Sequence, residues 1–315
     1  MAPQRMKPRP ALTVGRVYRR SDLLGLGFRE RDLTTCRFVT RLFRDAYVAT
    51  GSQIDLALRA RAALTVLPEG SLIDGPTAAR LWGGVVPGHE AITASVAAPH
   101  QVRADGISAT IRDELAARAR RRRYGVAVCD PATAFTDCAH RLGLVDLVVL
   151  ADGLIAAGVV APADLVAAAV GLRSRGRRHA LEAARLARSG VDSPPETRLR
   201  LLLVFAGLPE PQTNIIIRRA DGSWDRRHDM GWEEVKVAGE YDGRHHAEST
   251  VQWRRDLRRR EESDRDGWRH VVVTSEDLYV EPGETLRRFR DVLRERGMSC
   301  EIRSDRWRRF FPGRR

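Results

Sequence analysis

Cysteine is scarce in this chain of 315 residues, and the four cysteines are scattered along it. They form no C-x-x-C pair and have no histidine beside them at the spacing of a zinc site; they are Cys36, Cys129, Cys138 and Cys300. No long apolar run follows the basic, proline-rich start MAPQRMKPRP, so the pattern predicts neither a signal peptide nor a membrane span. We therefore expect a cytoplasmic protein without a disulfide scaffold, a zinc site or a membrane partner.

Lysine is rare as well, because almost all of the 54 basic residues are arginines, and the formal net charge is +13. The planar arginine side chain matches phosphate oxygens in pairs, which favours a polyanionic partner such as DNA. A GC-rich genome also raises the arginine content, but it does not explain the net excess of positive charge. At 43% hydrophobic and 30% charged, the composition is typical of globular proteins, and the length favours two or three compact units.

The first half begins with a flexible basic arm, residues 1–15, and continues with a winged-helix-like module over residues 16–52. Ser21 is expected to cap a short helix, DLLGLG, and Phe28 to begin a second one, FRERDLTTCRF. The segment FVTRLFRDAYVA then alternates apolar and polar residues as a β-hairpin does. Arginines on the polar side of the second helix are candidate DNA-binding residues: Arg29, Arg31 and Arg37.

Residues 53–190 are expected to form a mixed α/β middle domain that ends in a basic linker helix. The densest positive cluster of the chain, RARRRRY, lies here. Its candidate DNA-binding residues are Arg120, Arg121, Arg122 and Arg123. A Gly/Ser/Pro break follows the linker, and it predicts a domain boundary near Gly190.

The last part consists of a predicted domain over residues 191–300 and a basic tail over 301–315. Its pattern indicates a helix (196–206), two or three strands (212–243), a helix (about 250–266), a strand (270–274) and a helix (283–296). This α-β-β-β-α-β order predicts a mixed sheet flanked by helices, so the whole chain is expected to be a multidomain α/β (α+β) protein.

The segment RRHDMGWEEVKVAGEYDGRHH carries the candidate chemistry, because its alternation predicts an antiparallel hairpin about Trp232-Glu233-Glu234. Folding it there places Asp229 opposite Glu240, with Asp242 on the same face as Glu240. Clustered carboxylates repel one another, and an all-oxygen cluster suits Mg²⁺ or Mn²⁺. The plain alternative is an acidic, solvent-facing hairpin edge.

A fourth carboxylate, that of Glu196, opens the helix after the break. The sequence Ser193-Pro194-Pro195-Glu196 is typical of a capping box. Glu196 also shares a helix face with Leu199 and Leu203, which should pack on the sheet. We expect Glu196 both to cap the helix and to reach the strand ends.

Five segments together carry a resemblance to a known nuclease family: SPPETRLRLLL, RRHDMGW, VAGEYDGRHH, QWRRDLRRREE and DGWRHVVVTSEDL. The region from Ser193 to Leu278 resembles the branch of restriction-endonuclease-like PD-(D/E)xK nucleases that is related to the very-short-patch-repair endonucleases and is common in actinobacteria. The resemblance implies a magnesium-dependent nuclease whose metal ligands are Asp229, Glu240 and the Tyr241 carbonyl. It also implies that Glu196 assists through water or binds a second ion.

The chain departs from the family pattern at Asp242, where the motif has lysine. His246, Arg254 or Arg255 would then supply the positive catalytic group, and a histidine in the His245-His246 pair would act on the attacking water. Gln252 and Arg258 lie with the two arginines on the predicted helix, as a ridge suited to backbone phosphates or as an ordinary solvated face.

The first half resembles, more loosely, the winged-helix antitoxins of the AbiEi type, through SLIDGPTAARLWG and CDPATAFTDCAHRLGLVDLVVLADGLIAAG. Two hypotheses follow. One is a divalent-metal-dependent DNA endonuclease or nickase, acting in repair or defence. The other is a DNA-binding transcriptional regulator or antitoxin-like protein with an inactive nuclease-like domain. The presence of Glu196, Asp229 and Glu240 together favours the enzyme, while a protein partner, a cognate toxin and the oligomeric state are left open.

Overall fold

The structure, a computed structural model of the chain, describes residues 11–35, 37–88, 91–97, 102, 104–112, 120–173, 176–218, 221, 223–242 and 266–313. The chain divides into two compact units. The first unit comprises residues 1–142 and 164–181, and the second comprises 143–163 and 182–315. The protein is thus a multidomain α+β chain, and its second unit includes a segment that precedes the predicted boundary near Gly190. The finer division into five parts stays a prediction.

The N-terminal module is a three-stranded sheet with two short helices, in the strand order β1-β3-β2. Its elements are β1 (Val17–Arg19), α1 (Arg20–Gly25), α2 (Glu30–Thr34), β2 (Val39–Phe43) and β3 (Ala46–Ala49). The predicted helix–helix–hairpin order is confirmed, and β1 adds a strand that pairs antiparallel with β3. The helices and the hairpin share an apolar core of Tyr18, Leu23, Phe28, Leu33, Val39 and Tyr47.

Two predictions on these helices are wrong in detail. Ser21 lies inside α1, whose N-cap is Arg19, because the Asp22 carboxylate accepts a hydrogen bond from the Arg19 amide and fixes the first turn there. In the same way Asp32 accepts from the Arg29 amide at the start of α2. The second helix therefore begins after Phe28, which packs into the core, and it ends before Arg37.

The rest of the first unit contains a five-stranded sheet in the order β6-β5-β4-β8-β7. Its strands are β4 (Leu72–Ile73), β5 (Ile92–Ala97), β6 (Ile107–Arg112), β7 (Arg120–Arg123) and β8 (Val126–Cys129). The helices around it are α3 (Leu56–Val66), α4 (Gly75–Leu81) and α5 (Pro131–Cys138), and α7 (Pro162–Gly171) and α8 (Arg177–Leu186) follow later in the chain. Asp130 caps α5 through a bond from the Thr133 amide, as its Asp-Pro start predicts.

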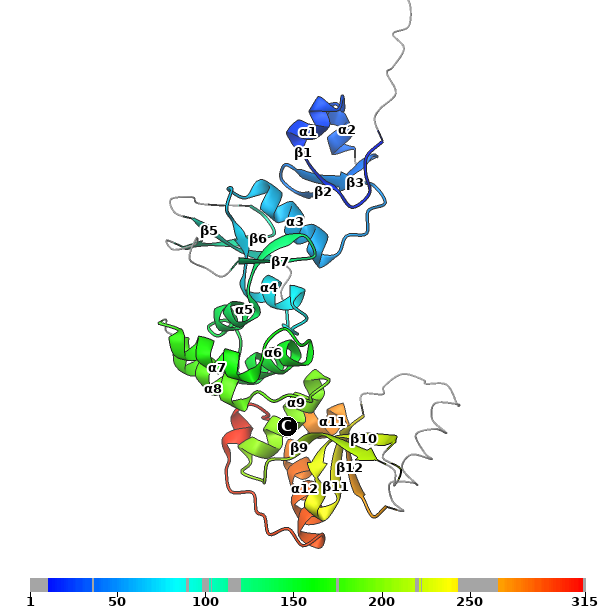
Figure 1. Ribbon diagram of the computed structural model, residues 1–315, viewed down its shortest axis with the longest axis vertical. Helices are drawn as coiled ribbons and strands as arrows, with labels where there is room; N and C mark the ends of the chain where they lie inside the picture. Colours follow the sequence, from blue (N-terminus) through cyan, green and yellow to red (C-terminus); the bar gives the residue numbers. More distant parts are fainter. Residues whose placement is uncertain are drawn as a thin grey trace, which may run out of the picture. The chain divides into compact units, whose positions relative to one another are not determined.

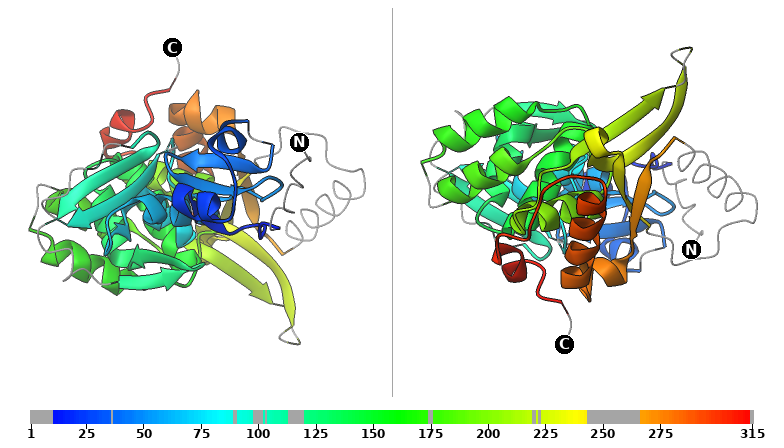
Figure 2. Two further views of the ribbon diagram at one scale, coloured as in Figure 1. Left: turned by 90° about the horizontal axis from the view of Figure 1, so that it is seen from above. Right: turned by 90° about the horizontal axis from the view of Figure 1, so that it is seen from below.

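The second unit is built on a four-stranded mixed sheet in the order β12-β11-β10-β9 (Figure 1). Its elements are α6 (Leu144–Ala156), α9 (Pro194–Phe205), β9 (Gln212–Arg218), β10 (Trp224–Trp232), β11 (Val237–Tyr241), β12 (Arg269–Val273), α11 (Ser275–Tyr279) and α12 (Pro282–Glu295). In this sheet β11 and β12 pair in parallel, whereas β10 pairs antiparallel with both β11 and β9. The strands β9 and β10 form a long, twisted ribbon that extends away from the helices of this unit (Figure 2). The predicted element order is confirmed, except that the helix expected over about 250–266 lies outside the described residues.

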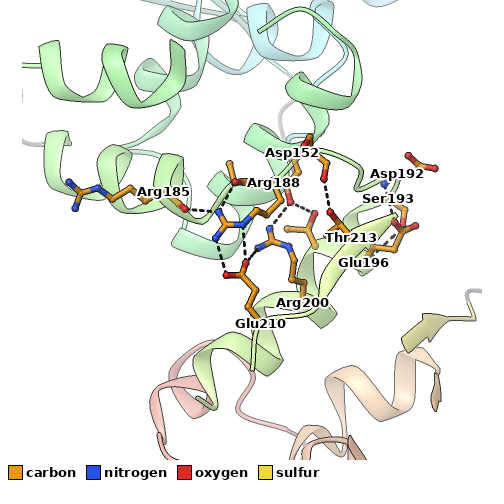
Figure 3. Close-up of polar contacts among 12 residues, drawn as sticks. Asp152, Arg185, Arg188, Asp192, Ser193, Glu196, Arg200, Glu210 and Thr213 are labelled. Atoms are coloured by element: carbon orange, nitrogen blue, oxygen red, sulfur yellow. Dashed lines mark hydrogen bonds and ion pairs between the residues drawn. The ribbon is translucent and has the colours of Figure 1, made fainter. Parts of the chain in front are cut away.

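Helix α9 is the centre of the second unit, and a buried ion pair holds it against α6. Arg200 on α9 is fully buried, and its Nη2 lies 2.9 Å from Oδ2 of Asp152 on α6 (Figure 3). The same carboxylate accepts hydrogen bonds from the Thr197 hydroxyl, at 2.9 Å, and from the Arg188 amide, at 2.7 Å. Three donors thus compensate a charge that has lost its water.

The C-terminal tail is part of this unit. A short 3₁₀ helix, η3 (Arg306–Arg309), buries Trp307, and Phe311 is buried after it. The Arg306 guanidinium lies 4.4 Å from the centre of the Phe205 ring on α9. In the described part of the chain no helix is long and apolar enough to cross a bilayer.

We predict that Asp152→Ala lowers the free energy of unfolding by about 3 kcal/mol, because it leaves the buried Arg200 with only the more distant Glu210 carboxylate, 3.6 Å from its Nη1, as counter-charge. The matched control is Asp146→Ala, which removes another α6 carboxylate paired with α9. Its partner Arg198 lies 2.5 Å away, but both side chains are part-exposed, so that change should cost at most about 1 kcal/mol. Urea unfolding followed by tryptophan fluorescence measures both, and equal losses in the two variants would contradict the prediction.

Candidate metal and catalytic site

The hairpin of β10 and β11 has the register that the sequence predicts. Met230 pairs with Gly239, and Trp232 pairs with Val237. A 3₁₀ turn, η2 (Glu233–Val235), closes it, followed by Lys236 in the left-handed conformation with φ of 52°. Gly239 makes room for the Phe289 ring of α12, since a Cβ there would meet ring carbons at 3.1 Å. This packing fixes β11 against α12 one residue before Glu240.

The regular alternation of faces is interrupted around Asp229. Met230 lies beside Gly239, on the face covered by Phe289, whereas His228 contacts Glu240, which points to the other face. In a regular strand, residues two positions apart, such as His228 and Met230, would share a face. The residue of β9 that the register places opposite Asp229 is Asn214, whose φ is 57°. Asp229 therefore occupies an irregular point of the ribbon.

Glu240 lies between two histidines. Its Oε1 is 3.1 Å from Nδ1 of His228 on β10 and 3.0 Å from Nδ1 of His270 on β12. His228 is buried, with 2% of its side chain exposed, and its ring packs 4.7 Å from the ring of Trp268. Three neighbouring strands thus bring one carboxylate and two imidazoles together.

The histidines decide the ionisation of Glu240. Burial alone would raise the pKa of this carboxyl. The hydrogen bond with His228 and the close approach of His270 outweigh that effect and hold the pKa of Glu240 well below its usual value. Glu240 is therefore a carboxylate throughout the physiological range.

The start of α9 brings a second acidic group to the ribbon. The Glu196 carboxylate accepts hydrogen bonds from the Asp192 amide, at 3.0 Å, and from the Ser193 hydroxyl, at 2.7 Å (Figure 3). Ser193 caps the helix through the Glu196 amide, so the predicted capping role of both residues is confirmed. Asp192 also forms an ion pair with Arg227 on β10, which ties the helix start to the strand.

Gly190 sets the approach of this segment to β9. Its φ is 76°, and a Cβ at this position would lie 2.8 Å from the Cβ of Asn214. The Thr213 hydroxyl donates to the Ser189 carbonyl at 2.7 Å in the same region. The Gly/Ser/Pro break of the sequence is thus a packed connection, and it delivers Glu196 towards Asp229.

Asp229 is the carboxylate on which these parts converge. Its Oδ2 accepts a hydrogen bond from the Tyr241 amide at 3.2 Å. Burial, the neighbouring Glu196 and, more weakly, Glu240 raise the pKa of Asp229 to about 6, against the opposing effect of the Tyr241 amide and Arg227. Asp229 is thus half-protonated at a pH of about 6, well above the usual range of an aspartate, as expected where a cation would be needed to hold the charges together.

The remaining predicted site residues divide into two groups. Asp242 follows β11 directly, and its amide donates to the Val273 carbonyl at 2.8 Å. Its place in the carboxylate patch and the metal-binding role of the Tyr241 carbonyl stay predictions. Five further candidates lie outside the described residues: His246, Gln252, Arg254, Arg255 and Arg258.

The sequence did not single out His228 and His270. His228 directly precedes Asp229. In a regularly alternating strand, His228 would lie on the face opposite to that of Asp229 and of Glu240, which the register places opposite Asp229. His270 reaches Glu240 through the parallel pairing of β11 with β12, in which Ala238 pairs with His270. A histidine within each of two strand-forming segments was the available signal.

The predicted arginine cluster forms β7, an edge strand of the five-stranded sheet. Arg120 donates to the Gly70 carbonyl, and Arg123 packs over the rings of Trp82 and Tyr124. Arg121 and Arg122 are exposed and bond only to nearby carbonyls. Within the described residues, no ion pair neutralises these four arginines. In the N-terminal module, Arg29, Arg31 and Arg37 are exposed.

No protein-family profile matches the chain, and no curated protein matches it. Among solved structures, it is similar to the crystal structure of RV2827C protein from Mycobacterium tuberculosis, with 17% sequence identity and a TM-score of 0.39. The similarity covers 59% of this chain and 75% of that one.

We predict that Asp229→Asn stabilises the metal-free protein as the pH rises. The folded pKa of Asp229 exceeds its unfolded value of about 3.9, so its stability contribution is present below pH of about 4 and lost as the pH rises through about 6. The asparagine variant avoids this loss and should gain up to about 3 kcal/mol over the wild type by pH 7. Urea unfolding in EDTA measures it, with Glu234→Gln in the exposed turn as the control. Parallel pH profiles of Asp229→Asn and wild type would refute it.

Proposed function

We propose that the second unit is a divalent-metal-dependent DNA endonuclease or nickase that hydrolyses phosphodiester bonds. The observation that carries this proposal is the gathering of carboxylates around Asp229, which lies part-buried on a hairpin of a mixed sheet, near enough to Glu196 and Glu240 for both to raise its pKa. Such crowding of carboxylates is costly without a cation. Support also comes from the element order and the five segments that resemble PD-(D/E)xK nucleases.

Asp229 and Glu240 would hold Mg²⁺ or Mn²⁺ in this proposal, together with the Tyr241 carbonyl. The ion would supply positive charge to the phosphate under attack and lower the pKa of water. Glu196 is anchored by the Asp192 amide and the Ser193 hydroxyl, so it acts from a fixed position at the start of α9. Its charge opposes ionisation of Asp229 until a cation arrives.

In this proposal, the two histidines beside Glu240 take the place of the lysine in the PD-(D/E)xK motif, as partners of the carboxylate. The chain has Asp242 at the motif position, and Lys236 is committed to the Asp266 carbonyl at the other end of β11, with its Nζ 3.0 Å away. His228 and His270 instead provide the donors that keep Glu240 ionised. Imidazole nitrogens thus face the Glu240 carboxylate without a lysine.

The first unit would hold the DNA. The strand β7 presents exposed arginines along a sheet edge, with no carboxylate paired to them in the described part of the chain. Contacts of this kind neutralise backbone phosphates without reading sequence. The exposed Arg29 and Arg31 at the start of α2 would add to this surface.

We predict that Asp229→Asn and Glu240→Gln each abolish cleavage of plasmid DNA in Mg²⁺ or Mn²⁺, because each removes a negative charge from the proposed ion site. EDTA should abolish wild-type cleavage as well. The matched control is Glu234→Gln, which removes an exposed carboxylate from the turn of the same hairpin and should cut normally.

Cleavage that survives in Asp229→Asn would contradict the proposal and favour the DNA-binding regulator instead. Asp242→Asn adds information on the departure from the motif. Persistent cleavage in that variant would show that Asp242 is not an essential ligand, and the positive group would then be sought among His246, Arg254, Arg255 and the two histidines beside Glu240.

We also predict that Arg121→Ala/Arg122→Ala weakens binding to duplex DNA of any sequence. Each phosphate contact that is lost reduces the number of counterions released on binding. The slope of log K against log salt should therefore become shallower by about 2. Fluorescence anisotropy over a salt series measures this. The control, Arg141→Ala/Arg178→Ala, removes equal charge elsewhere in the first unit. An identical change of slope in both double variants would show that β7 is not part of the DNA-binding surface.

A further inference from the structure

We propose that His228, Glu240 and His270 form a binding site for a first-row transition-metal ion of the kind that imidazole prefers, such as Zn²⁺ or Co²⁺. The site is separate from the all-oxygen Mg²⁺ site proposed around Asp229, although the two would share the Glu240 carboxylate. The inference rests on the proposed nuclease function only for its biological role, because its evidence is the geometry of these three residues.

The spacing of the donor atoms fits a metal site. The three residues offer ligand atoms that all lie within 4.8 Å of one another. Glu240 Oε1 is 3.1 Å from His228 Nδ1 and 3.0 Å from His270 Nδ1. Ligands about 2.1 Å from one ion are about 3.0 Å apart at right angles and about 3.4 Å apart in a tetrahedral site. An ion can thus fit among these atoms with a small movement of the side chains.

The burial of His228 is not explained by Glu240 alone. Only 2% of its side chain is exposed, and its Nε2 has no hydrogen-bond partner among the residues that the structure describes. A buried polar nitrogen without a partner is costly. The rings of Trp268 and His270, centred 4.7 and 5.0 Å away, also restrict the imidazole to one orientation. An imidazole buried and oriented at this cost is a preformed ligand.

The donor set determines the class of ion. Two imidazole nitrogens and one carboxylate oxygen favour Zn²⁺, Co²⁺ or Ni²⁺ over Mg²⁺, which binds through oxygen. Three protein ligands leave further coordination positions open, as in sites where an ion contacts water or substrate. Asp229 and Glu196 are not part of this group of three ligand residues, and as carboxylates they retain the all-oxygen character that suits Mg²⁺.

The test is a titration of the EDTA-treated full chain with Co²⁺, followed by visible absorption, with Zn²⁺ competition. We expect His270→Gln and Glu240→Gln each to weaken Co²⁺ binding by at least about 10-fold, and His228→Gln to do the same. The exposed His140 in the first unit supplies the control, since His140→Gln should bind Co²⁺ as the wild type does. Circular dichroism checks that each variant is folded, and His270→Gln decides the matter if the more buried His228→Gln does not fold.

Asp229→Asn separates this inference from the proposed nuclease function. It should abolish Mg²⁺-dependent cleavage yet keep Co²⁺ binding. Co²⁺ binding that depends on the two histidines would support the site even if the wild type cuts no DNA. Absence of Co²⁺ and Zn²⁺ binding, or binding that is unchanged in His270→Gln and Glu240→Gln, would overturn the inference.

Discussion

The buried ion pair between Asp152 and Arg200 is the interaction on which the second unit depends. It fixes helix α9 against α6 at a point where both charges have lost water, and three donors to one carboxylate leave little freedom in the pairing. Because Glu196 lies about one turn before Arg200 on α9, the same constraint sets the position of this carboxylate. The stability of the unit and the geometry of the candidate site are therefore linked through one helix.

At the site, the pKa values of two neighbouring carboxyl groups are shifted in opposite directions. Two imidazoles keep Glu240 ionised, whereas burial and Glu196 raise the pKa of Asp229 to about 6. Divergent pKa values in paired acids are typical of functional sites, although ion-pair networks in purely structural positions produce them as well. A cation that binds beside Asp229 must compete with a proton, so metal affinity should increase as the pH rises through 6.

Local sequence patterns predicted much of this fold but only half of the candidate site. The Ser-Pro-Pro-Glu cap, the hairpin register and the order of elements follow from turn chemistry and periodicity, which depend on neighbouring residues. The start of α1 was misplaced because Asp22, within the helix, bonds back to Arg19 and outweighs the preference of Ser21 for a cap. His228 and His270 escaped prediction because the first depends on an irregularity opposite Asn214 and the second on a parallel pairing between distant segments.

The histidine pair also bears on the proposal that this unit is a PD-(D/E)xK-like nuclease, because that motif has lysine where this chain has Asp242. A lysine at the motif position would place a single, mobile positive charge beside the carboxylates, and it would be paired with them under all physiological conditions. Imidazoles differ, because they can donate a proton to Glu240, or give it up and coordinate a metal ion through the same nitrogen. In the proposed nuclease, Asp242 at the position of the motif lysine is therefore compatible with a working site. Glu240 is held between His228 and His270, and these imidazoles can serve it as hydrogen-bonding partners or bind a metal ion beside it.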